Sequence, residues 1–169
     1  MFVLLLGMGS VTVIDAKNQL RRDDFADERM RILAGRDALA AALGITYIDG
    51  GVGRATVSMV VGKEHLNCYG TCHGGTIFTL ADLAFGLASS SYNVIAPGID
   101  VHITYHVPVR VGQRLTATSA EIYRGNKLAV IRVEVRDEGW VVVSNFTGTA
   151  FVTARAIEES LTVGHQDIP

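Results

Sequence analysis

Residues 76–91 read TIFTLADLAFGLASSS, and this stretch decides the fold. At helical spacing its apolar side chains reach every face, and the larger ones are Ile77, Phe78, Leu80, Leu83, Phe85 and Leu87. A helix that is apolar all round must be covered by protein on all sides. We therefore predict a central helix, which the rest of the chain must enclose.

Four strand-like stretches follow this helix, at residues 99–109, 114–123, 127–136 and 140–153. The turn sequences that separate them are Val111-Gly112, Gly125-Asn126 and Asp137-Glu138-Gly139. Neighbouring strands joined by such short links are expected to pair antiparallel, as a meander.

The part upstream of the central helix adds one helix and two strands. Residues 23–43 have roughly helical spacing, with acidic residues near the start, Gly35 as a possible break and Gly44 as the stop. Residues 45–49 and 54–61 are predicted strands, with the turn at Gly50-Gly51. The order predicts an α+β fold, in which one curved antiparallel β-sheet wraps the central apolar helix.

Composition and charge exclude several classes of partner. The length of 169 residues fits one domain, expected at 23–154 between an N-terminal extension at 1–22 and a surface tail at 155–169. The formal net charge of −2, without a long run of Lys or Arg, disfavours nucleic acid. Cys68 and Cys72 supply neither a disulfide framework nor a zinc ligand set, so we expect no metal and a reduced, cytoplasmic protein.

The apolar residues 1–14 call for a separate interpretation. No positive charge precedes Phe2, as a signal peptide requires, and Asp15 arrives too early for a membrane span of about 20 residues. We expect a loosely attached or packed extension, and no association with a membrane.

Asp82 is the single charged residue within 76–91, and it lies in the middle of the predicted helix. An unpaired carboxylate that is removed from water costs several kcal/mol of stability or takes up a proton. Two interpretations stay open: a partner elsewhere in the core satisfies Asp82, or the protein uses the acid in chemistry.

His73-Gly74-Gly75 stands where a polar loop enters this helix. Glycine lets the backbone approach a ligand closely, and the first N–H groups of a helix carry partial positive charge. The N–H of Gly74 or Gly75 is therefore suited to an oxyanion hole for a carbonyl under attack, although two glycines also make a tight corner.

The spacing of these groups has a consequence for assembly. Asp82 lies seven residues beyond Gly75, which is roughly 10 Å along one helix. One carbonyl cannot touch both groups, so a joint role requires two chains with their helices antiparallel across a two-fold axis. A homodimer is therefore part of the hypothesis.

Three short motifs then resemble the signature of the phenylacetic acid degradation (PaaI-type) hotdog-fold acyl-CoA thioesterases. They are Leu66-Asn67, Cys72-His73-Gly74-Gly75 and Phe78-x-Leu80-Ala81-Asp82-x-Ala84-Phe85, and a looser resemblance covers residues 38–151. The resemblance implies a hotdog fold, a dimer of dimers, and aryl- or hydroxyphenylacetyl-CoA as substrates. It implies no cofactor, because coenzyme A is part of the substrate.

The resemblance also implies roles for individual residues. Asp82 takes the position of the nucleophile or general base, and Gly74 that of the N–H that polarises the carbonyl. His73 would orient that carbonyl or brace its loop as a helix cap. Asn67 would position a water or the neighbouring subunit's acid, or serve only as a turn residue.

Substrate-binding residues are expected at two places. Gly75 and Thr76 follow Gly74 at the helix start. The coenzyme A phosphates require cations at a sheet edge or loop, for which Arg110, Arg124 and Lys127 are candidates, although solvated cations are common at strand ends.

The sequence departs from the family pattern at two positions. His106-Val107-Pro108 stands where many members have Arg-Pro, and Gly98 stands where related animal enzymes have a helper serine. Ser89, Ser90 and Ser91 either substitute for that serine or finish the helix. These departures leave the acyl preference open.

Two other functions compete on the same fold. One is a sensor that binds acyl-CoA without hydrolysis, and the other is an enoyl-CoA hydratase or dehydratase that uses His73 with Asp82. The product discriminates: free thiol indicates a thioesterase, a change in enoyl absorbance a hydratase, and neither a sensor.

Overall fold

The computed structural model describes residues 16–157. Its helices are α1 (Ala16–Arg36), α2 (Ala38–Ala42) and α3 (Gly74–Ser90), with a 3₁₀ turn η1 at Lys63–His65. Its strands are β1 (Thr46–Gly51), β2 (Arg54–Val60), β3 (Gly98–Tyr105), β4 (Arg114–Arg124), β5 (Leu128–Asp137) and β6 (Val142–Phe151). They form one antiparallel sheet in the order β1-β2-β4-β5-β6-β3.

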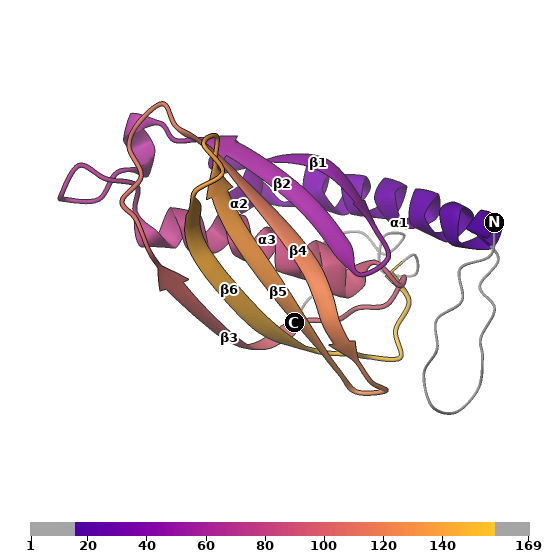
Figure 1. Cartoon of the computed structure of the whole chain (residues 1–169). Helices are drawn as coiled ribbons and strands as arrows, with labels where there is room; N and C mark the ends of the chain where they lie inside the picture. The colour runs from indigo at the N-terminus through magenta and orange to yellow at the C-terminus, as the bar shows by residue number, and fades with distance from the viewer. Residues whose placement is uncertain (1–15, 158–169) are drawn as a thin grey trace.

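The curved sheet covers one side of α3, and α1 runs beside β1 behind the sheet (Figure 1). Alternate residues of the strands point toward α3, as the pleat requires, and the buried ones include Val57, Met59, Leu115, Ala117, Ile131, Val133 and Val135. This arrangement confirms the predicted α+β architecture of a curved antiparallel sheet around a central apolar helix.

Phe85 fixes α3 against the sheet. Its ring centroid lies 5.6 Å from that of Phe146 on β6. A Cβ atom added to Gly148 would lie 2.6 Å from the Phe85 ring, and one added to Gly98 would lie 2.9 Å from it. Both strands therefore need glycine here, so that the backbone can contact the ring directly.

The predicted pairing of neighbouring strands is correct for β4, β5 and β6 but wrong for β3. β3 pairs with β6 at the far edge, and β4 pairs with β2 instead. The connection between β3 and β4 bonds to other loops: Val109 accepts a hydrogen bond from Cys72, and Gly112 donates one to Val61. The connection thus braces the loop before α3, and the two strands separate.

The first helix begins at Ala16, seven residues before the predicted start at Asp23. Asp23 does not cap a helix, because its carboxylate accepts a hydrogen bond from Val52 N at 2.8 Å and lies 3.7 Å from Arg54. The acidic residue therefore marks a contact with the β1–β2 hairpin. The break between α1 and α2 falls at Asp37, close to the predicted point.

The turn between β1 and β2 lies at Val52-Gly53, two residues after the predicted position. Gly53 has a φ of +74°, which glycine adopts without strain. Gly50 lies within β1, and it is glycine for a different reason. A Cβ atom at this position would lie 2.5 Å from the side chains of Met30 and Tyr47.

α3 is open on one face, so the prediction that protein covers it on all sides is wrong for a single chain. Asp82 is exposed, and the partly exposed residues beside it are Phe78, Thr79, Leu83, Gly86 and Ser90. The sheet covers only one side of α3, and α1 contacts α3 only along the edge of the open face.

The predictions for residues 1–14 and for most of the C-terminal tail concern residues outside the described range, and the division into domains stays a prediction. Within residues 16–157, no helix has the length and apolar character needed to cross a membrane.

Candidate active site

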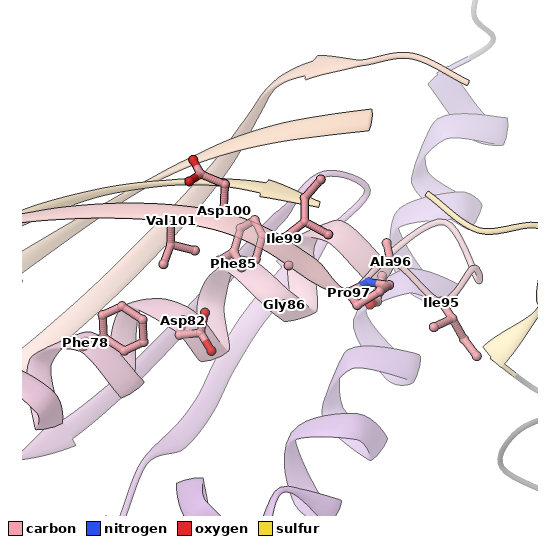
Figure 2. Close-up of a pocket in the computed structure, with 12 residues that line it drawn as sticks. Phe78, Asp82, Phe85, Gly86, Ile95, Ala96, Pro97, Ile99, Asp100 and Val101 are labelled. Carbon is pink, nitrogen blue, oxygen red and sulfur yellow. The ribbon is translucent and has the colours of Figure 1, made fainter. Parts of the chain in front are cut away.

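Asp82 borders two clefts on the open face of α3. The first, here called the β3 cleft, has a volume of about 730 Å³ and lies between α3 and β3, with Phe78 and Val101 among its walls (Figure 2). The second, the α2 cleft, has a volume of about 430 Å³ and includes Asp37 and Leu83. The carboxylate is therefore accessible to a small molecule from either side.

The surrounding protein raises the pKa of the Asp82 carboxyl group. The larger cause is the loss of solvent around the carboxylate, although the side chain is still exposed in the single chain, and the smaller cause is the charge of Asp37. Within residues 16–157, Asp82 has no hydrogen bond or ion pair that would compensate. Nothing in this part of the chain satisfies Asp82, which favours the interpretation that the protein uses the acid in chemistry.

His73 is the N-cap of α3, with extended backbone angles and an Nδ1 that accepts the Gly75 N–H at 2.8 Å. The backbone oxygen of His73 also accepts the N–H of Thr76 at 3.0 Å. Its ring is therefore held as a hydrogen-bond acceptor at Nδ1, which fits the bracing alternative. Thr76, a predicted substrate-binding residue, is buried at 7% exposure and faces the protein interior.

The cap distinguishes Gly74 from Gly75, which the position at the helix start had left as equal candidates for the oxyanion donor. The Gly75 N–H is occupied by His73, whereas the Gly74 N–H has no hydrogen-bond partner among residues 16–157. An unpaired N–H at the first residue of a helix, under the partial positive charge of its N-terminus, is the group that an oxyanion requires. Gly74 is therefore the candidate donor.

Gly74 borders a third cleft, of about 330 Å³, here called the Gly74 cleft. Asn67, Tyr105 and His106 are among its other walls. Asn67 holds a turn there: its Oδ1 accepts from Tyr69 N at 2.9 Å and Thr71 N at 3.2 Å, which fits the turn-residue alternative.

The structure does not bring Asp82 and Gly74 together within one chain. They border different clefts, and eight residues of α3 separate them by roughly 12 Å. The distance that the spacing predicts is therefore present in the folded chain.

The predicted phosphate-binding cations fall at opposite ends of α3. Arg110 follows Val109, which borders the Gly74 cleft, at the start of the helix. Arg124 lies at the other end, where it donates to the Ser89 backbone oxygen at 2.7 Å and to Glu121 at 2.7 Å. Its guanidinium also stacks 3.9 Å from the Tyr92 ring centroid, so internal contacts occupy it.

Lys127 lies after the β4–β5 turn, and Arg124 lies before it. The Lys127 ammonium group lies 5.8 Å from the Phe151 ring centroid, which leaves its donors available to solvent or an anion.

The serines after the helix serve its C-terminal end. Ser89 donates to the Ala96 backbone oxygen at 3.0 Å, and Ser91 donates to the Ala88 oxygen at 2.8 Å; both are buried. Ser90 differs, because it borders both the β3 cleft and the α2 cleft with Asp82.

Sequence reasoning missed four residues that share these clefts. Asp37 and Thr79 stand in the α2 cleft with Asp82, Asp100 stands in the β3 cleft, and Tyr105 contacts Gly74. No local motif marks them, because chain folding alone brings them to the site. Among residues 16–157, no three His, Cys, Asp or Glu side chains are grouped so that they could hold a metal ion.

Known proteins match this arrangement. The profile of the thioesterase superfamily matches residues 69–144. A putative esterase from Archaeoglobus fulgidus is 42% identical over 115 residues, which cover 68% of this chain and 75% of the relative. The acyl-coenzyme A thioesterase PaaI of Escherichia coli is 37% identical over 112 residues, 66% of this chain and 80% of the relative. The chain belongs to the PaaI-type hotdog thioesterase family.

Solved structures of the family agree. The structure of Escherichia coli PaaI, from the phenylacetic acid degradation operon, superposes with a TM-score of 0.77 at 31% identity, covering 79% of this chain and 97% of PaaI. A Streptococcus mutans protein bound to acetyl-CoA has a TM-score of 0.64 at 30% identity, covering 66% of this chain and 90% of that one. The hotdog fold and the predicted class of enzyme, a thioester hydrolase, are confirmed.

Proposed function

We propose that the protein hydrolyses acyl-CoA thioesters at a site that two protomers share. Asp82 of one protomer is the nucleophile or general base, and the Gly74 N–H of its partner polarises the thioester carbonyl. The observation that carries this proposal is the separation of an unpaired acid and an unpaired N–H into different clefts of one chain.

Two open surfaces support the homodimer. β3 is an edge strand with exposed Ile99, Val101 and Tyr105, and its outer edge pairs with no other described strand. Such an edge invites another strand, and the open face of α3 lies across the β3 cleft from it. If two copies of β3 pair antiparallel about a two-fold axis, the two α3 helices also lie antiparallel, and each Gly74 approaches the partner's acid. Two such dimers would form the proposed dimer of dimers.

The chemistry follows from these two groups. Attack on the thioester carbon, by the Asp82 carboxylate or by a water that Asp82 deprotonates, places negative charge on the carbonyl oxygen. The Gly74 N–H stabilises that charge, the carbon–sulfur bond breaks, and coenzyme A leaves as the thiol once protonated. On the water route the acyl group leaves directly as a carboxylic acid. On the nucleophile route it stays on Asp82 as a mixed anhydride, which water then hydrolyses to the carboxylic acid and free Asp82, so that one water is consumed on either route.

The walls of the β3 cleft suit an arylacetyl group. Phe78, Phe85, Ile99 and Val101 supply aromatic and apolar surface, while Asp82 marks the reacting end. We propose phenylacetyl- or hydroxyphenylacetyl-CoA as substrates, with Arg110 and Lys127 as the candidate phosphate contacts. The free thiols of Cys68 and Cys72 fit a cytoplasmic setting for this activity.

The hydratase alternative loses support from the helix cap. His73 is committed to Gly75 through Nδ1, and nine residues of α3 separate it from Asp82 by roughly 13 Å. The two side chains of one chain therefore lie too far apart to act as an acid–base pair on one β-carbon. A pair across the proposed dimer interface is tested by the enoyl-CoA assay below. A pure sensor would also have no use for an uncompensated carboxylate in its cleft.

A substrate panel tests the proposal. The purified protein is incubated with phenylacetyl-, hydroxyphenylacetyl-, short-chain and medium-chain acyl-CoA, and free thiol is measured; an enoyl-CoA is followed by its absorbance. We expect thiol release, fastest with the arylacetyl esters. A change in enoyl absorbance without thiol release would contradict the proposal, as would binding of acyl-CoA with no turnover.

The charge of Asp37 predicts a shift in the pH profile. Asp37 caps α2, where its Oδ1 accepts from Ala40 N at 2.8 Å, and its charge helps raise the pKa of Asp82. Activity requires ionised Asp82, so it falls as the pH drops through this raised pKa. Asp37→Asn keeps the cap but removes the charge, so the acid limb of kcat/KM is expected to move to lower pH.

The other charges near Asp82 serve as controls for this measurement. Arg36 borders the α2 cleft and Asp100 the β3 cleft. Arg36→Gln removes a positive charge from the same cleft. Among the charged groups of residues 16–157 only Asp37 shifts the pKa of Asp82, so this variant is expected to leave the acid limb in place. An acid limb that stays in place in Asp37→Asn would show that this carboxylate has no influence on Asp82.

A further inference from the structure

Tyr105 contacts the first residue of the catalytic helix by two kinds of interaction. Its hydroxyl donates a hydrogen bond of 3.0 Å to the Gly74 backbone oxygen, across 31 residues of sequence. Its ring also lies close against Gly74, because a Cβ added there would stand 3.3 Å from Cζ and 3.4 Å from Oη. The hydrogen bond acts on the Gly74–Gly75 peptide group and the ring packs at the Gly74 Cα, so the two contacts fix the backbone directly after the peptide group that carries the candidate N–H.

The other end of this contact is hydrogen-bonded to β6. Tyr105 is the last residue of β3, where it pairs with Ser144 of β6. The next residue, His106, donates its N–H to the Val143 oxygen at 2.9 Å, and Ser144 donates its hydroxyl to the Thr104 oxygen at 2.8 Å. Hydrogen bonds to β6 therefore hold the chain directly before and directly after Tyr105.

The helix start that Tyr105 contacts contains two glycines. Gly74 and Gly75 are adjacent, and glycine has more backbone freedom than any other residue. His73 fixes the Gly75 N–H, but within the described residues the Tyr105 hydroxyl is the only side chain that bonds to Gly74. Although Tyr105 is about half exposed, partial loss of solvent raises the pKa of its hydroxyl, so this group stays protonated and able to donate.

We propose that Tyr105 is a positioning residue, which holds Gly74 so that its N–H stays directed at the substrate carbonyl. This inference rests on the proposed function of Gly74. An oxyanion donor is effective when it is oriented before the reaction, because no reorganisation then accompanies the build-up of charge. Tyr105 acts through Gly74, and its effect therefore belongs to kcat more than to substrate binding.

Tyr105→Phe tests the inference, since it removes one hydroxyl and keeps the ring against Gly74. We expect kcat to fall about fivefold to tenfold, the range that one lost hydrogen bond supports, with KM for the acyl-CoA nearly unchanged. Tyr123→Phe is the matched control: Tyr123 is 58% exposed on β4, and no hydrogen bond of its hydroxyl occurs within residues 16–157. Tyr123→Phe is expected to keep the wild-type kcat and KM.

A second measurement does not depend on activity. ¹⁵N relaxation of the Gly74 amide reports its motion directly, and we expect a lower order parameter in Tyr105→Phe than in the wild type or Tyr123→Phe. An unchanged order parameter with unchanged kcat would overturn the inference, as would a large rise in KM with constant kcat. If Asp82→Asn were fully active, the proposed function would fail, while the Gly74 amide would still show whether Tyr105 holds it.

Discussion

Asp82→Asn is expected to reduce kcat about a thousandfold. The amide can neither attack the thioester nor take a proton from water, and a positioned base contributes about 10²–10⁴ in rate. Because Asp82 is exposed and bonds to no other described residue, the fold does not depend on its charge. Thiol release from an arylacetyl-CoA at saturation measures kcat directly.

The same substitution has a predicted effect on stability. The folded protein raises the pKa of Asp82, so it binds this proton more tightly than the unfolded chain does. Protonated Asp82 therefore stabilises the folded protein. This contribution is fully present below the pKa of Asp82 in the unfolded chain, and it is lost as the pH rises through the higher pKa of the folded protein. At neutral pH Asp82→Asn should therefore melt at a higher temperature than the wild type, with a gain that shrinks in acid.

Asp24→Asn is the control for this variant, because Asp24 is an exposed acid on α1. It should keep full activity and should not reproduce the rise in melting temperature. A fully active Asp82→Asn enzyme would remove this residue from the mechanism.

Gly74→Val is expected to lower kcat at least a hundredfold. The first carbon of the new side chain would already stand 3.3 Å from the Tyr105 ring, and its two methyl groups extend further into the Gly74 cleft. Either the Tyr105 side chain or the helix start must then move, and a Gly74 N–H that loses its orientation costs as much as one lost oxyanion donor, about 10²–10³ in rate. Gly74→Ala should show a smaller loss in the same assay.

Gly35→Ala controls for the loss of a glycine. It lies in α1 with open space around it, so the substitution should leave kcat unchanged and slightly stabilise the helix. Wild-type turnover in Gly74→Val, with the fold intact, would show that turnover does not depend on how the helix start is held at Gly74.

Periodicity predicted the elements that depend on local pattern. The apolar run at 76–91 gave α3 to within two residues at each end, and the turn residues separated β4, β5 and β6 correctly. The position of β3 could not be predicted, because it depends on where the connection at residues 106–113 finds hydrogen-bond partners. The start of α1 was missed because Asp23 looks like a helix start but bonds to the hairpin.

The candidate site was predictable where chemistry breaks a local rule. An acid within an apolar helix and two glycines at its start identify Asp82 and Gly74 without any structure. Their neighbours Asp37 and Tyr105 lie in ordinary helix-cap and strand positions, and only tertiary folding brings them close. The open face of α3 was missed because an apolar helix face that the chain's own sheet leaves uncovered looks the same in sequence as one that the sheet covers.

Complementation between the two inactive variants tests the shared site most directly. In a heterodimer of Asp82→Asn and Gly74→Val, one site carries both substitutions and the other carries neither. Unfolding and refolding an equal mixture makes about half of the dimers mixed, so about a quarter of wild-type activity should return. Activity no higher than that of the separately refolded variants, in samples where heterodimers have formed, would contradict a site built from two protomers.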